Sequence, residues 1–144
     1  MGKIAYMNIG GKRYPLSFSL GASKRISEKY GGLDSLAAAM SGVETLEVKS
    51  LDMLVDMAVI LISQGCAYKN VFEKNLPREE GDPVDENGNY IPLTKEEVEV
   101  GIQLMDVKDF SLAIFESMGR SLKTEVETAE KDSERKNAGA TPGL

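Results

Sequence analysis

The sequence contains no histidine and a single cysteine among its 144 residues. Histidine is the commonest general base and a frequent metal ligand, so its absence excludes the catalytic arrangements that depend on an imidazole. One cysteine excludes an internal disulfide, and without histidine it cannot form the usual zinc ligand sets. Cys66 has only Lys69 as a nearby basic residue in the sequence, which favours a structural thiol over a nucleophile. The remaining carboxylates and lysines form no catalytic motif, so we expect no enzyme activity.

Long hydrophobic runs are also absent. The most apolar stretch is Met57–Ile62, which is far too short to span a bilayer and indicates a buried helix. Residues 1–14 lack the apolar segment of a signal peptide. We therefore expect an intracellular, soluble protein with no membrane partner. Because tryptophan is missing and other aromatics are few, the core must be built from leucine, isoleucine, valine, methionine and alanine.

Positive charge is scarce relative to negative charge: the formal net charge is −6 and the isoelectric point is about 4.8. Nucleic-acid binding needs a basic face, so we expect no nucleic-acid partner. Gly10-Gly11-Lys12 lacks the other residues of a phosphate loop. Residues 85–89 resemble part of a calcium loop, but aligning Gly88 with the sixth position puts Pro83 first and Thr94 twelfth, where acidic ligands are required. We expect no metal and no cofactor.

The N-terminal residues predict a β-hairpin over 3–18 that turns at Gly10-Gly11. Pro15 cannot donate to a strand ladder, so its strand must be an edge. On the first strand, Ile4 and Tyr6 are expected to supply apolar side chains to the core.

A short amphipathic helix over 20–30 is predicted directly after the hairpin. Ser19 is a suitable N-cap, and Gly31 can end the helix in the left-handed conformation. The apolar stripe of this helix, at helical spacing, consists of Ala22, Ile26 and Tyr30.

The rest of the chain predicts further helices and one long connection. Ser50 is expected to cap a helix over 51–74 that is apolar almost all round, with a break or kink at Gly65. In the connection over 76–93, Asn87-Gly88 predicts a tight hairpin turn. The other predicted elements are helices over 34–40, 95–105 (opened by a capping box at Thr94 and Glu97) and 107–123, and a charged, partly helical to disordered tail over 124–144. The predicted fold is mainly α (α+β), with one domain over 1–123 in which the hairpin packs on about four to five helices.

The last predicted helix has a wide apolar face. Ordinary core packing is the commoner reason for such a face, and contact with a partner or with a second copy of the chain is the other. The candidate partner-binding residues on this face are Val107, Phe110, Ile114, Phe115, Met118 and Leu122.

The N-terminal stretch IGGKRYPLSFSLGASKRISEKYGGLDSL resembles the opening of tail assembly chaperones of long-tailed phages and prophages of Gram-positive hosts. In that family a strand with the pattern G-K-x-Y-x-L-x-F runs into a helix that ends in an acidic, a basic and a tyrosine residue. The resemblance covers about residues 3–123, and the segment 78–91 departs from it like an insertion. The matching residues are Gly11, Lys12, Tyr14, Leu16, Phe18, Glu28-Lys29-Tyr30, Ala67-Tyr68-Lys69 and the helical region 93–122.

The resemblance implies a protein without enzyme activity or cofactor. Members of the family bind the tape measure protein, keep it soluble and help to bring tail tube protein to it. They commonly self-associate. They act in the host cell cytoplasm and are not expected in the mature virion.

Two other classes remain open at this point. A non-catalytic structural or adaptor protein of the phage tail or head-to-tail connection would share the small size and the lack of catalytic residues, but it would stay in purified virions. A DNA-binding regulator would need a basic helix face and salt-sensitive binding, and the sequence offers no such face.

Overall fold

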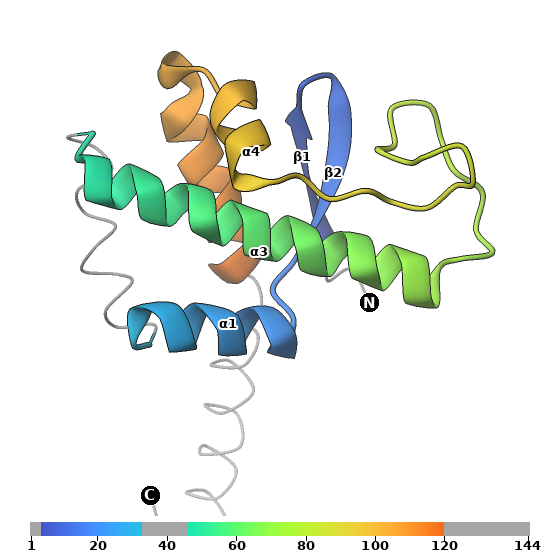
Figure 1. The fold of residues 1–144 in the computed structure, drawn as a ribbon, viewed down its shortest axis with the longest axis horizontal. Coiled ribbons are helices and arrows are strands. Elements are labelled where there is room, and N and C mark those ends of the chain that lie inside the picture. Colours follow the sequence, from blue (N-terminus) through green and yellow to red (C-terminus); the bar gives the residue numbers. More distant parts are fainter. Residues whose placement is uncertain (1–3, 33–45, 120–144) are drawn as a thin grey trace, which may run out of the picture.

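The computed structural model describes residues 4–32 and 46–119. It confirms a mainly helical α+β fold that begins with a β-hairpin (Figure 1). The elements of this part are β1 (Ile4–Ile9), β2 (Lys12–Ser17), α1 (Leu20–Tyr30), α3 (Val48–Phe72), α4 (Lys95–Gly101), a 3₁₀ turn (Leu104–Asp106) and a helix over 107–119. The helix predicted over 34–40 and the tail over 124–144 lie outside the described residues.

The hairpin turns at Gly10 and Gly11, which both have positive φ angles. Its two strands are antiparallel, with Met7 opposite Tyr14. The prediction for the inner face of β1 was wrong by one residue: Met7 and Ile9 are buried, whereas Tyr6 is 37% exposed. Strand side chains alternate between faces, so placing Met7 beside the buried Tyr14 turns Tyr6 the other way.

Helix α1 begins and ends as the sequence predicts. The side chain of Ser19 accepts a hydrogen bond from the Ala22 N–H at 3.0 Å. At the other end Gly31 has a φ of 82°, and its N–H donates to the Ser27 carbonyl. Ala22 and Ile26 are fully buried, so the helix is fixed to the rest of the fold by the predicted stripe.

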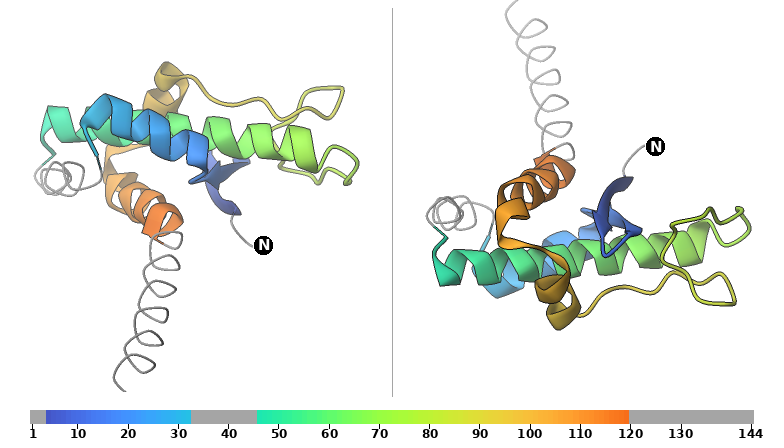
Figure 2. Two further views of the ribbon diagram at one scale, coloured as in Figure 1. Left: turned by 90° about the horizontal axis from the view of Figure 1, so that it is seen from below. Right: turned by 90° about the horizontal axis from the view of Figure 1, so that it is seen from above.

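Helix α3 is the central element, and α1 runs beside it (Figure 1). The hairpin and the 107–119 helix share one side of α3 (Figure 2). α3 starts at Val48, earlier than predicted, with Glu47 rather than Ser50 at the N-cap position. Ser50 is buried within the first turn instead. Half of the largest fully buried side chains of the described core belong to α3, including Leu54, Met57, Leu61 and Ile62.

Gly65 neither breaks nor kinks α3, which continues to Phe72. Strand β2 crosses the helix at this glycine. A Cβ atom added to Gly65 would collide with the backbone carbonyl of Pro15 and would lie 2.9 Å from the Leu16 nitrogen. The glycine therefore permits a close crossing of helix and strand, which sequence periodicity alone does not reveal.

With its 25 residues, α3 is long and apolar enough to cross a membrane, judged on length and composition within the described chain. The core helix of a globular domain meets the same criterion. Here 56% of the most apolar stretch is buried within the fold, against the hairpin, α1 and α4. The packing is that of a core helix.

The long connection after α3 contains the predicted turn: Val84 and Tyr90 form an antiparallel bridge around Asn87-Gly88. The capping box that opens α4 is also present, with Thr94 accepting from the Glu97 N–H and Glu97 accepting from the Thr94 N–H. α4 ends at Gly101, however, and not at 105. Ile102 is extended, and the chain then passes through the 3₁₀ turn into the 107–119 helix.

Candidate functional site

The structure divides the predicted partner-binding face of the last helix. Phe110, Ile114 and Met118 are buried in the hydrophobic core, so they pack inside the domain rather than on its surface. Val107 is partly buried against the same core, and Phe115 is 38% exposed. Leu122 lies outside the described residues. Core packing thus explains half of the six residues, and Val107 and Phe110 near the beginning of the helix line an open hollow.

That hollow is an apolar groove of about 250 Å³ between α3, α4 and the start of the 107–119 helix. We call it the α3–α4 groove. Its lining combines two of the predicted residues with side chains that sequence reasoning did not select. The lining residues are Leu51, Leu54, Val55, Val98, Glu99, Ile102, Leu104, Val107 and Phe110.

The groove is bordered by apolar side chains that the fold leaves exposed. Leu104 lines it and is 66% exposed, and the neighbouring Met105 is almost fully exposed. On α3, Val48 is exposed and lies two helical turns before Val55, so it continues the same row of side chains. The sequence predicts a continuous helix over 95–105, which would include Met105. Because α4 stops at Gly101, the segment after it turns outward.

Acidic side chains lie on and beside the groove. Glu99 lines it, and Asp106 and Asp109 line an adjoining hollow of about 340 Å³ that shares Ile102 and Phe110 with it. Within residues 4–32 and 46–119, none of these three carboxylates has an ion-pair or hydrogen-bond partner. The segment 94–119 as a whole carries Glu96, Glu97, Glu99, Asp106, Asp109 and Glu116 against Lys95 and Lys108.

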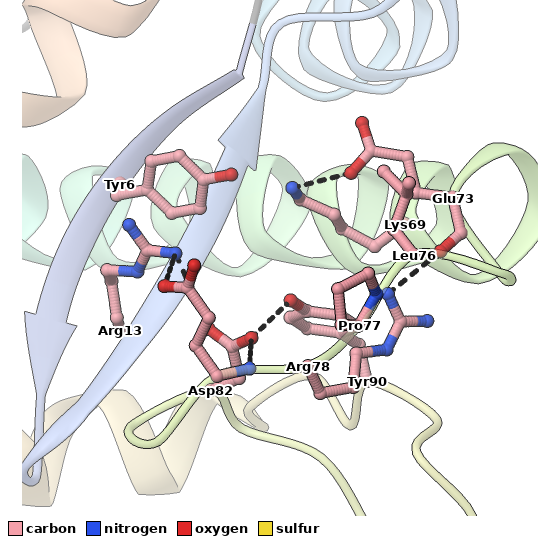
Figure 3. A pocket seen from close by; sticks show the side chains of 10 residues that line it. Tyr6, Arg13, Lys69, Glu73, Leu76, Pro77, Arg78, Asp82 and Tyr90 are labelled. Atoms are coloured by element: carbon pink, nitrogen blue, oxygen red, sulfur yellow. Dashed lines mark hydrogen bonds and ion pairs between the residues drawn. The ribbon is translucent and has the colours of Figure 1, made fainter.

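A second, polar hollow of about 310 Å³ lies where the hairpin meets the end of α3 and the long connection (Figure 3). On the hairpin side, Arg13 stacks over the ring of Tyr6, 4.1 Å from its centre, and pairs with Asp82 at 3.5 Å. Asp82 also accepts hydrogen bonds from the Tyr90 hydroxyl and from the Glu79 N–H. Burial alone would raise the pKa of Asp82, but these bonds and the arginine outweigh it and lower the pKa.

The other side of this polar hollow is equally well paired. The Arg78 guanidinium donates to the carbonyls of Glu73 and Gly88, and it stacks over the Tyr90 ring. Lys69 pairs with Glu73 at 2.8 Å. Within the described residues, Asp82 Oδ1 accepts no hydrogen bond and has only the Arg13 guanidinium near it. The other contacts hold the long connection against the hairpin and α3, and we interpret this network as structural.

A third cluster joins α1, α3 and α4 at the buried carboxylate of Asp56. Asp56 accepts a hydrogen bond from the Tyr30 hydroxyl at 2.7 Å and pairs with Lys29 at 2.9 Å and Lys95 at 3.3 Å. Burial acts to raise its pKa, but the bonds from these three side chains outweigh burial and lower it. Lys95 also pairs with Asp52 at 2.7 Å, so its charge is already compensated. No sequence pattern indicates this cluster, because its members come from three elements that are far apart along the chain.

Nothing in the described residues combines reactive groups into a catalytic arrangement. Cys66 is buried, and burial raises the pKa of its thiol to about 12, so it stays protonated at neutral pH. Residues 4–32 and 46–119 hold no group of three acidic, cysteine or histidine side chains placed to bind a metal ion. The α3–α4 groove is therefore the candidate site, and its chemistry suits the docking of another polypeptide.

No family model, curated protein or solved structure matches the chain.

Proposed function

We propose that this chain is a tail assembly chaperone of a long-tailed phage or prophage that binds the tape measure protein and keeps it soluble during tail tube assembly. A chaperone of this kind needs accessible apolar surface for its client and net charge for its own solubility. The observation that carries the proposal is the α3–α4 groove, where a compact acidic domain leaves apolar side chains accessible from three elements.

The residues behind the family resemblance support the proposal because they have definable roles in the fold. Gly11 makes the hairpin turn, and Tyr14 and Leu16 are buried in the core. Lys29 and Tyr30 contact Asp56 and so attach α1 to α3. These matching residues therefore stabilise the hairpin and the contact between α1 and α3.

The proposed partners are the tape measure protein and the tail tube protein, with self-association of the chaperone. The proposed place of action is the host cell cytoplasm, and the protein is absent from the finished virion.

Co-expression with the tape measure protein encoded in the same genome tests this function. We expect the client to be soluble and to co-elute with this chain, and to become insoluble when this chain is omitted. Purified virions provide the second measurement. A client that stays insoluble beside abundant soluble chain, together with the chain in the virion, would favour a structural or adaptor protein of the tail.

A further inference from the structure

We infer that the occupant of the α3–α4 groove is an amphipathic helix whose apolar stripe is flanked by lysine or arginine. This inference deepens the proposed function and rests on it for the source of the helix, a segment of the client. The groove and its charges specify the chemistry of the helix.

The form of the groove favours side chains of a helix over a small molecule. Closed ligand pockets in proteins usually enclose about 300–1,000 Å³ and place a few polar groups among apolar walls. The α3–α4 groove is smaller, and Glu99 is the one ionisable group among its lining residues. Its walls come from α3, from α4 with the residues that follow it, and from the start of the 107–119 helix, so an apolar row at i, i+3, i+4 and i+7 can lie against them.

The charges around the groove determine what must flank that apolar row. Glu99, Asp106 and Asp109 are unpaired within the described part of the chain and lie on or beside the groove. Lys49 on α3 and Lys108 have no ion-pair partner within the described residues, and Lys95 is held by Asp52 and Asp56. A basic helix would compensate the three carboxylates, whereas an acidic helix would be repelled.

The basic helix α1 of a second copy cannot be the occupant of the α3–α4 groove. α1 carries Lys24, Arg25 and Lys29, but its apolar residues Ala22 and Ile26 are fully buried in its own domain. α1 therefore has no exposed apolar row that could enter the groove. Another exposed apolar surface lies at the end of α3, where Val71 and Phe72 are 67% and 73% exposed, and it serves below as the control.

Two synthetic helical peptides test the inference on the full-length protein. Both carry leucines at i, i+3, i+4 and i+7, and the flanking positions are lysine in one peptide and glutamate in the other. We expect fluorescence anisotropy to show that the lysine peptide binds at least about tenfold more tightly at low salt, with the difference shrinking as salt is raised.

Matched variants show which surface of the protein binds the lysine peptide. Leu104 and Phe72 are 66% and 73% exposed, so replacing either by serine should leave the fold intact, as circular dichroism can check. Leu104→Ser should weaken binding of the lysine peptide roughly tenfold. Phe72→Ser should leave the binding unchanged, and Glu99→Lys should reduce the preference for lysine over glutamate.

Three results would overturn the inference: equal binding of the two peptides, equal loss of binding in Phe72→Ser and Leu104→Ser, or a dimer in sedimentation that Leu104→Ser dissociates. Repeating the co-expression experiment with Leu104→Ser separates this inference from the proposed function. If the wild-type chain and Leu104→Ser both keep the client soluble, the function holds and the groove inference fails. If the groove binds the lysine peptide but the wild-type chain leaves the client insoluble, the groove inference holds and the function fails.

Discussion

Replacing Gly65 by alanine is expected to destabilise the protein, although alanine is the better helix former. In an isolated helix the change would stabilise by about 1 kcal/mol. Here the new methyl group would meet the backbone of Pro15 and Leu16, and no side-chain rotation can relieve that contact. Overpacking of this kind costs about 1–3 kcal/mol or more, and a clash with backbone falls at the upper end of that range. The expected net loss is about 2 kcal/mol.

Thermal unfolding measures this loss. For a domain of this length each kcal/mol corresponds to about 4 °C, so the melting temperature of Gly65→Ala should fall by about 8 °C. Ala67→Gly is the matched control, because Ala67 is exposed on the same helix two residues later. It should lose about 1 kcal/mol through helix propensity alone. If Gly65→Ala melts at or above the wild-type temperature, the close crossing of β2 over α3 is not a constraint and the reasoning is refuted.

Three further predictions concern the buried polar groups and caps. The pKa of Asp56 is lowered in the folded protein, so its ionised carboxylate stabilises the fold. This stabilisation is fully present above the ordinary aspartate pKa of about 4, and it is lost as the pH falls through the lower pKa of the folded protein. Urea unfolding of Asp56→Asn should therefore show a loss of about 2 kcal/mol at pH 7 that shrinks below pH 4, and a constant loss would contradict the assignment. The thiol of Cys66 should react with a disulfide reagent at pH 8 only after denaturation, since its pKa is about 12 and it is buried; fast reaction of the native protein would disprove this. Thr94→Ala removes the capping box and should cost about 1 kcal/mol in denaturant unfolding, and an unchanged midpoint would mean that α4 does not depend on its cap.

Features that depend on neighbouring residues could be predicted from the sequence. The cap at Ser19, the glycine stop at Gly31 and the capping box at Thr94 all act within one helical turn, so the residue types alone indicate them. The turn at Asn87-Gly88 is local in the same sense.

Features that depend on contacts between distant residues could not be predicted. The alternation along β1 permitted either face, and only its pairing with Tyr14 decides that Met7 points inward. Gly65 suggested a break because glycine is a poor helix former, whereas its role is to let β2 approach. In the candidate site, Val107 and Phe110 were found from the apolar pattern, but Leu104 was missed because the early end of α4 turns it toward solvent.

The way in which strand β2 is covered limits how copies of this protein can associate. The N–H of Arg13 points away from β1 and donates to the Gly81 carbonyl at 2.8 Å. Pro15, two residues along, faces the same way and has no N–H to offer. The outer edge of β2 therefore presents no donor at either position, and an incoming strand cannot extend the sheet there. Such an edge hinders the hairpin from templating a growing β-aggregate on this side.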